Sequence, residues 1–431
     1  MPGAVHLSRR QCLGASALLL SGLLFSGCAA PSTAAEPVTI QMVINKLEIV
    51  DYMRDVIDKF ERSHPGIKVD LVLGEAGFVP SLVRDSPPDV TTRGWAEASA
   101  SLAQRGVFSD LSGLDAAKAV EPKYQKLVDE WGSYDPNATV ALPFSVTAAG
   151  VIYNKDLFKK YGVAVPTTWD EFRAACEKFQ ENGVTPIYGT YQTPWTIGQG
   201  MLDYAVGGTT DVASFFASLN KVGSKFAPNG NVTFSHAFTK ALPAMEYLRT
   251  VTQPNASSQT YSNGNAAMAK GKAAMYLQGP WALSAIHSIN SEVNLGSFPL
   301  PVTNDPADTK VRVSVDMAIS IPEGARHPEE ARQFVEFLFQ PDIINKYNRD
   351  NAAYSTLKNA PSQADPRIEG LTSYIESGKF YQGTLTYLPV SVPVRAYVQS
   401  FALGGDGKTF LRAIDEQWAR VAARTTFLGE Q

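Results

Sequence analysis

A tryptophan follows a short apolar strand in the stretch GKAAMYLQGPW, residues 271–281. Pro280 has no backbone N–H and cannot continue a β ladder, so the strand is expected to stop before it. Trp281 is then presented at a strand end, which is where α/β proteins hold their ligands. An indole at this place either stacks on a ligand or covers the core, and the sequence leaves both interpretations open.

One carboxylate interrupts the apolar run from Val311 to Ile321. Burying an unpaired carboxylate is costly, so Asp316 is expected either to be paired or to accept hydrogen bonds from ligand hydroxyls. Charged and polar side chains also follow predicted strands elsewhere, although such side chains are often only solvated. They are Asn45 and Lys46 after the first strand, Glu75 after the second and Arg93 after the third.

The sequence lacks the motifs of common catalytic and metal sites. The five histidines lie far apart, and HExxH, CxxC and the spaced aspartates of a calcium loop are missing, so no metal or other cofactor is expected. GxSxG is also missing, which removes support for a hydrolase nucleophile elbow. Residues 402–409 (ALGGDGKT) lack the first glycine of a phosphate-binding loop. Two carboxylates brought together by the fold to hydrolyse a glycoside stay an alternative.

Length and composition indicate a folded soluble protein with two lobes. A chain of 431 residues is too long for one ordinary core. Hydrophobic residues make up 44% and charged residues 19%, which is typical of globular proteins. The formal net charge is −4 and no basic run is longer than a pair, which argues against a nucleic-acid partner.

The first 28 residues have the pattern of an export signal. Arg9 and Arg10 precede an uncharged stretch over residues 14–25, and Phe25-Ser26-Gly27-Cys28 closes it. Residues 1–27 resemble a bacterial lipoprotein signal, which implies lipidation of Cys28, and both the general secretory and the twin-arginine routes stay open. Residues 28–37 would then form a flexible tether. With Cys28 acylated, Cys176 has no partner, and no internal disulfide is expected.

The remaining chain alternates predicted strands and helices. Strands over residues 39–44 and 67–73 enclose a helix that stops at His64-Pro65-Gly66. Two apolar strands are predicted over residues 140–144 and 150–154, with residues 145–149 between them. Thr168-Trp169-Asp170-Glu171 matches a helix capping box. This βαβ pattern predicts an α/β fold with a parallel sheet covered by helices.

Three stretches together resemble family 1 of the extracellular solute-binding proteins, the carbohydrate receptors of ABC importers that include maltose-binding protein. They are residues 141–172 (ALPFSVTAAGVIYNKDLFKKYGVAVPTTWDEF), 271–286 (GKAAMYLQGPWALSAI) and 328–355 (PEEARQFVEFLFQPDIINKYNRDNAAYS). The resemblance implies a two-lobed, periplasmic-binding-protein-like fold of type II, with a ligand cleft between lobes joined by a multi-segment hinge. One lobe would hold residues 38–144 and 318–355, and the other residues 150–315 and 356–431.

The resemblance also implies a carbohydrate site. Sugars expose C–H groups on their ring faces and hydroxyls at their rims, so flat aromatic rings bury the first and polar groups bind the second. The implied stacking rings are Trp95, Trp195 and Trp281. The implied polar contacts are Asn45, Lys46, Glu75, Arg93, Ser145 and Asp316. Further candidates are Tyr387 and Arg395, in a segment where maltose-binding protein is richer in aromatics; this difference argues against maltodextrin as the ligand.

The function implied by the family is capture without catalysis. The lobes would close on a sugar or oligosaccharide and deliver it to the permease subunits of an ABC importer. The receptor is expected to be a monomer, anchored outside the cytoplasm by its lipid, with no cofactor and no nucleic-acid partner. The alternatives are a receptor for a glycerophosphodiester or a polyamine, and a secreted glycosidase.

Overall fold

The computed structural model describes residues 36–424, except 47–48, 75 and 133. The predicted export signal and Cys28 lie outside the described residues, as does Glu75. The described residues from Pro37 onward form one compact unit. Among the described residues, no helix has both the length and the apolar character needed to span a membrane.

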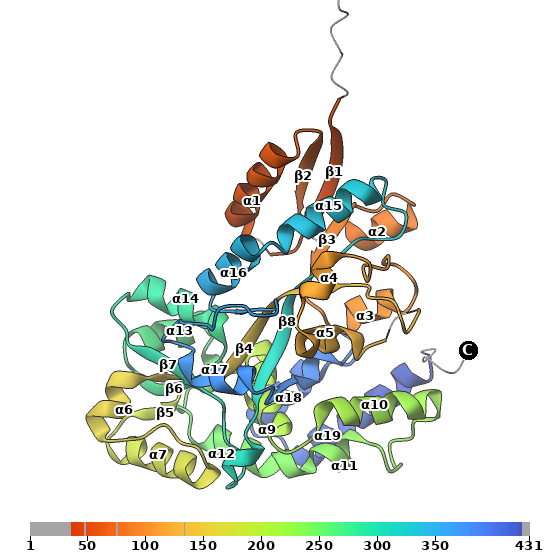
Figure 1. The fold of residues 1–431 in the computed structure, drawn as a ribbon. Coiled ribbons are helices and arrows are strands. Elements are labelled where there is room, and N and C mark those ends of the chain that lie inside the picture. Colours follow the sequence, from red (N-terminus) through yellow and green to blue (C-terminus); the bar gives the residue numbers. More distant parts are fainter. Residues whose placement is uncertain (1–35, 47–48, 75, 133, 425–431) are drawn as a thin grey trace, which may run out of the picture. The chain divides into compact units, whose positions relative to one another are not determined.

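The described strands pair into one branched sheet (Figure 1). Its main path runs β2-β1-β3-β8-β4-β6-β5, while β10 pairs with β8 and both β7 and β9 pair with β4. The strands are β1 (Val38–Ile44), β2 (Ile67–Leu73), β3 (Val90–Arg93), β4 (Leu142–Asn154), β5 (Thr185–Ile187), β6 (Ala273–Gln278), β7 (Leu295–Phe298), β8 (Val311–Ser320), β9 (Tyr354–Ser355) and β10 (Phe380–Gln382). β1 is parallel to β2 and β3, as the βαβ pattern predicts. β5 with β6 and β10 with β8 are also parallel. The sheet as a whole is mixed and not parallel throughout as predicted, because β8 runs antiparallel to both β3 and β4.

The long strand β4 joins two parts of the sheet. Its first part pairs with β8, from Leu142 to Ala149, and its second part pairs with β6 and β7, from Gly150 to Asn154. The prediction of two separate strands is therefore wrong, because residues 145–149 continue the ladder instead of forming a loop. The register between β4 and β8 is irregular near Ser145 and passes over Phe144 on one strand and Asp316 on the other. Such bulges bend a strand and redirect side chains.

Helices cover the sheet and connect its strands (Figure 1). They are α1 (Val50–Ser63), α2 (Phe78–Val83), α3 (Glu97–Ala103), α4 (Asp115–Ala119), α5 (Pro122–Asp129), α6 (Lys155–Tyr161), α7 (Trp169–Glu181), α8 (Pro194–Ile197), α9 (Asp203–Gly207), α10 (Val212–Val222), α11 (Phe234–Phe238), α12 (Leu242–Thr250), α13 (Tyr261–Ala269), α14 (Pro280–Ile289), α15 (Pro328–Leu338), α16 (Pro341–Asp350), α17 (Glu369–Glu376), α18 (Val394–Ala402) and α19 (Gly407–Ala422). The predicted stop of the first helix before His64 and the capping box at Thr168 are both confirmed.

The buried apolar side chains form three clusters. The first packs β1 and β3 against α1, α15 and α16, and the second packs α7, α10, α12, α18 and α19 together. The third lies along β4 and β8 and contains both Trp95 and Leu283, which belong to different predicted lobes. Cys176 is buried in the second cluster, and burial raises the pKa of its thiol to about 12, as expected of a core cysteine. The division into two lobes stays a prediction.

Candidate functional site

Three partly exposed aromatic rings lie together at the starts of three helices. Trp195 opens α8, Tyr261 opens α13 and Trp281 opens α14. The ring centroids of Trp195 and Tyr261 are 5.0 Å apart, and those of Trp195 and Trp281 are 6.5 Å apart, with the planes inclined by 53° and 60°. We call these three residues the aromatic group. Inclined, partly exposed rings of this kind form a corner in which an apolar ligand face can be buried.

Local sequence fixes the helix starts that carry these rings. Pro194 and Pro280 each occupy the first turn of a helix. Backbone N–H groups in that turn have no hydrogen-bond partner within the helix, so proline loses no bond there. Thr260 caps α13 through a capping box with Asn263. The hydroxyl of Thr193, the residue that precedes α8, accepts a hydrogen bond from the Tyr261 backbone N–H at 3.1 Å. This bond ties the start of α13 to the start of α8.

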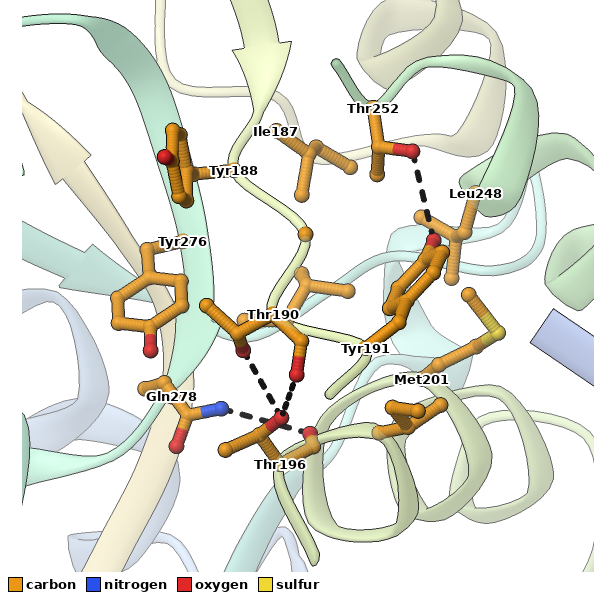
Figure 2. Close-up of a pocket in the computed structure, with 13 residues that line it drawn as sticks. Ile187, Tyr188, Thr190, Tyr191, Thr196, Met201, Leu248, Thr252, Tyr276 and Gln278 are labelled. Atoms are coloured by element: carbon orange, nitrogen blue, oxygen red, sulfur yellow. Dashed lines mark hydrogen bonds between the residues drawn. The ribbon is translucent and has the colours of Figure 1, made fainter. Parts of the chain in front are cut away.

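A small cavity lies among the residues that support the aromatic group (Figure 2). Its volume is about 20 Å³ and its lining includes Thr190, Thr196, Tyr276 and Gln278. Figure 2 shows the Gln278 amide reaching the Thr196 carbonyl and the Thr190 and Thr196 hydroxyls in contact. A cavity of this size holds one water molecule and is too small for a sugar.

A second group of polar side chains follows one face of β8. Arg312, Ser314 and Asp316 alternate along the strand with Val313 and Val315, whose side chains lie in the core. Ser314 shares a hydrogen bond of 3.1 Å with Thr147 on β4. We call Arg312, Ser314, Asp316 and Thr147 the polar strip.

Asp316 is paired, as one of the two sequence-based interpretations requires. Its carboxylate forms an ion pair with Lys46, which follows β1. The Lys46 ammonium also lies 3.4 Å from the hydroxyl of Tyr347 on α16. Both charged side chains keep some contact with solvent, since 17% of the Lys46 side chain and 32% of the Asp316 side chain are exposed. The carboxylate therefore remains accessible to a ligand hydroxyl.

The loop after β3 continues along β8 beside Asp316. The Trp95 N–H donates to the Val315 carbonyl at 3.0 Å, and a side chain on Gly94 would contact the Asp316 carbonyl. Arg93 places its guanidinium 5.0 Å above the Phe78 ring and donates to Ser99 at 3.3 Å. The sequence-predicted residues Lys46, Arg93 and Asp316 are thus brought to one region of the sheet.

The opposite end of the polar strip is held by a buried ion pair. Arg312 donates to Asp203 on α9 at 3.0 Å, and both side chains are almost completely buried. Asp203 also accepts hydrogen bonds from the Thr384 hydroxyl and the Leu385 N–H. Buried charges need such a full set of partners.

β4 pairs both with β8, which carries most of the polar strip, and with β6, the strand that leads to Trp281. Arg312 lies opposite Ala149, and Gln278, three residues before Trp281, lies opposite the next residue, Gly150. At the other end of the strip, Asp316 lies beside the pairing of Val146 with Val315. Val146 and Gly150 are four residues apart, which is about 13 Å along an extended strand. The same strand therefore positions both groups.

Two predicted polar contacts have buried atoms without a hydrogen-bond partner among the described residues. These atoms are Oδ1 of Asn45 and Oγ of Ser145. Asn45 precedes Lys46, and Ser145 lies at the bulge beside Asp316. Buried polar atoms of this kind need a partner such as water or a ligand.

Two predicted ligand contacts lie in the core instead. Trp95 is 2% exposed and its indole N–H donates to the Val128 carbonyl at 3.2 Å. Tyr387 is sandwiched between Trp131 and Phe216, with ring centroids 4.5 and 4.6 Å away, and burial raises the pKa of its phenol well above the ordinary value. Neither ring has a free face, so we remove both from the proposed site.

Arg395 lies on the surface at the start of α18. Its side chain stem approaches Gly198, which directly follows α8. Arg395 therefore lies on a helix that neighbours the helix of Trp195. Arg395 therefore stays a candidate at the edge of the aromatic group.

The sequence did not single out several residues of this region. They are Tyr261, Gln278, Tyr347, and the pair Asp203 and Arg312. The capping box that begins at Thr260 could have identified Tyr261, because it predicts a helix with an aromatic residue at its first position. Tyr347, Asp203 and Arg312 contact residues that lie far away in the sequence, as does the amide nitrogen of Gln278, and only the fold reveals these contacts. Among the described residues, no cluster of histidine, cysteine or carboxylate side chains is arranged to hold a metal ion.

Comparisons with known proteins agree with this geometry. The family model described as bacterial extracellular solute-binding protein matches residues 46–343. The multiple sugar-binding protein of Streptococcus mutans is 24% identical over 381 residues, covering 84% of this chain and 86% of that protein.

Solved structures show the same fold. RafE from Streptococcus pneumoniae in its apo form has a TM-score of 0.77 at 22% identity, covering 90% of this chain and 99% of that one. RafE in complex with raffinose has a TM-score of 0.73 at 23% identity, covering 90% and 100%. A sugar transporter protein from Bacillus licheniformis in complex with stachyose has a TM-score of 0.66 at 20% identity, covering 89% and 100%.

The match of the family model over most of the chain, together with the shared fold, decides the identity. The glycosidase alternative, in which two carboxylates hydrolyse a glycoside, is dropped, because members of this family are receptors and not enzymes. The chain therefore belongs to the bacterial extracellular solute-binding protein family, and it is a non-enzymatic, extracytoplasmic receptor of the kind that serves ABC transporters.

Proposed function

We propose that this receptor binds a sugar or an oligosaccharide for an ABC importer. The observation that carries the proposal is the aromatic group, in which Trp195, Tyr261 and Trp281 are all partly exposed and mutually inclined. Rings of this kind bury the C–H faces of a sugar, and the ordered polar groups of the same sheet can bind its hydroxyls. The bound raffinose and stachyose in the two structural relatives support the same ligand class.

The polar strip and its neighbours supply hydroxyl partners of both kinds. Asp316 accepts hydrogen bonds, the Lys46 ammonium donates them, and Asn45 and Ser145 each hold a buried oxygen without a partner. A sugar hydroxyl donates one hydrogen bond and accepts others, so it can bridge Asp316 and Lys46 while leaving their ion pair intact. This arrangement selects a neutral, polyhydroxylated ligand, because the two charges already compensate each other.

Capture would proceed by closure of two lobes around the ligand. The predicted lobes are joined by β4 and β8, and closure requires a ligand that binds the closed state more tightly than the open one. In this proposal, the closed protein docks on the permease subunits, and acylated Cys28 anchors it to the membrane. The receptor acts as a monomer and needs no cofactor.

Isothermal titration calorimetry on residues 29–431, which include the whole compact unit, tests the ligand class. Raffinose, stachyose and galactose are titrated in parallel with glycerophosphocholine and spermidine. Heat of binding with at least one saccharide, and none with the other two compounds, is expected. Binding of glycerophosphocholine or spermidine with no response to any saccharide would replace the sugar by that alternative ligand.

A further inference from the structure

We infer that Gln278 is the positioning residue that fixes the Trp281 ring and ties it to the helix of Trp195. The inference rests on the proposed function, because it concerns how the proposed aromatic group is held. Gln278 ends β6, is 2% exposed and lies opposite Gly150 on β4. Its amide nitrogen points toward the Thr196 carbonyl of α8 (Figure 2).

The Gln278 amide uses both of its polar ends. Its Oε1 accepts a hydrogen bond from Trp281 Nε1 at 3.1 Å. Its Nε2 donates to the carbonyl of Thr196, the residue after Trp195, at 3.4 Å. A primary amide offers an acceptor to the indole and a donor to the carbonyl from the same planar group. One buried side chain therefore joins the Trp281 indole to the backbone next to Trp195.

The backbone around Gln278 is also fixed. The Tyr204 hydroxyl donates to the carbonyls of Gly150 at 3.1 Å and of Gln278 at 3.3 Å. Burial raises the pKa of the Tyr204 phenol above the ordinary value, so this hydroxyl remains a donor. The amide of Gln278 thus starts from a strand end that cannot shift without breaking these bonds.

Gly279 gives Trp281 its second constraint. A side chain carbon at Gly279 would lie 2.3 Å from the six-membered ring of Trp281, so this ring rests directly on the backbone. One edge of the indole is held by the Gly279 backbone and the N–H edge is held by Gln278. The ring is left with one orientation, and a ring held in advance loses less entropy when a ligand stacks on it.

The indole resonances in two-dimensional ¹H–¹⁵N NMR spectra test this inference without a ligand. The sequence contains six tryptophans, and Trp281→Phe identifies the Trp281 resonance. In Gln278→Met, the Trp281 Nε1–H resonance should shift more than that of any other tryptophan, and it should exchange faster with solvent. Gln278→Glu keeps an oxygen for the indole and should shift this resonance less than methionine does.

Gln382 provides a matched control. It is also 2% exposed, and its Nε2 donates to a backbone carbonyl, that of Leu127 at 2.9 Å. Gln382→Met should leave the Trp281 resonance in place. An unchanged Trp281 resonance in Gln278→Met, or an equal shift in both methionine variants, would overturn the inference. If Gln278→Met does not fold, the comparison of Gln278→Glu with Gln278→Asn takes its place, because the shorter amide cannot reach both partners.

Calorimetry with the saccharide that the wild-type protein binds supplies a double-mutant cycle. Loss of the positioning bond should weaken binding about 3- to 10-fold in Gln278→Met, the usual effect of one hydrogen bond. The same substitution in a Trp281→Phe background should have little further effect, because phenylalanine has no N–H to hold. Additive effects would mean that Gln278 does not act through Trp281. Failure of every saccharide to bind the wild-type protein would count against the proposed function alone, since the NMR comparison still decides the role of Gln278.

Discussion

The ring of Trp281 has one edge on the Gly279 backbone and its N–H on Gln278, while part of its surface stays open. Trp281→Ala removes this ring, and binding of the saccharide should weaken by about 1–3 kcal/mol, as for other aromatic anchors. Calorimetry measures the change. Trp169→Ala is the control, because Trp169 stacks on Phe172 at the start of α7, outside the aromatic group. Equal affinity of Trp281→Ala and the wild-type protein would assign this tryptophan to the core.

Asp316 binds Lys46 beside the register shift between β4 and β8. Asp316→Asn removes a charged acceptor, so binding of the same saccharide should weaken by about 1.5–3 kcal/mol. The matched control is Asp51→Asn, which changes a fully exposed carboxylate of α1 that is also paired with a basic side chain. If both variants bind the saccharide equally well, Asp316 has only a structural role.

Two expectations about single residues, the placement of Trp281 after a strand and the pairing of Asp316, agree with the structure. The missing N–H of Pro280 and the isolated charge of Asp316 are properties of single positions, so the sequence alone places Trp281 at a strand end and gives Asp316 a partner. Trp95 and Tyr387 could not be assigned in the same way. Whether their rings are open depends on Val128, Trp131 and Phe216, which lie far away in the sequence. The role of Gln278 could not be predicted from the sequence, because a polar residue in an apolar strand does not indicate which two groups its amide will bind.

At the scale of elements, the buried ion pair of Arg312 and Asp203 connects β8 with α9 and with the segment before α18. Arg312→Met leaves the Asp203 carboxylate buried without its charged partner, and the free energy of unfolding should fall by about 3–5 kcal/mol. Chemical denaturation measures this loss. Arg54→Met, which breaks an exposed pair on α1, should cost less than about 1 kcal/mol. A similar small loss for Arg312→Met would show that the pair is not needed for stability.

The cap of α19 should make the stability of this helix depend on pH. The Thr409 N–H donates to the Asp406 carboxylate at 2.7 Å, and this bond lowers the pKa of Asp406 below its ordinary value. A carboxyl group with a lowered folded-state pKa stabilises the protein above its unfolded pKa, and this stability is lost as the pH falls through the folded-state value. Asp406→Asn caps the helix without titrating. The melting temperature of the wild-type protein should therefore fall relative to that of Asp406→Asn below about pH 4, near the ordinary pKa of aspartate. A constant difference down to pH 2 would contradict this account.

The elements themselves were predicted unevenly. The stop of α1 and the cap of α7 follow from local chemistry at His64-Pro65-Gly66 and Thr168, and both are confirmed. The continuity of β4 was missed because Ser145-Val146-Thr147-Ala148-Ala149 has no strong strand pattern of its own. These residues are extended because β8 and β9 pair with them from distant parts of the chain.

For the whole molecule, ligand binding should change both dimensions and stability. At a saccharide concentration of 100 times Kd, binding to the native state alone raises the free energy of unfolding by about 2.7 kcal/mol. Lobe closure should also reduce the radius of gyration, which small-angle X-ray scattering measures on the same samples. A stabilised protein with an unchanged scattering curve would retain the receptor role and exclude the proposed closure.

The shared strand β4 also governs how this chain can fold. Gly150 approaches the Phe298 carbonyl so closely that even a methyl group would lie 2.4 Å from its oxygen, and the residue before it still pairs with β8. A cut between Ala149 and Gly150 would leave the first part of β4 in the N-terminal fragment and its partner β8 in the C-terminal fragment, so the β4–β8 ladder would be lost from both. Neither fragment is then an autonomous folding unit, so insertions and gene fusions should be tolerated at the surface turns and not at this junction.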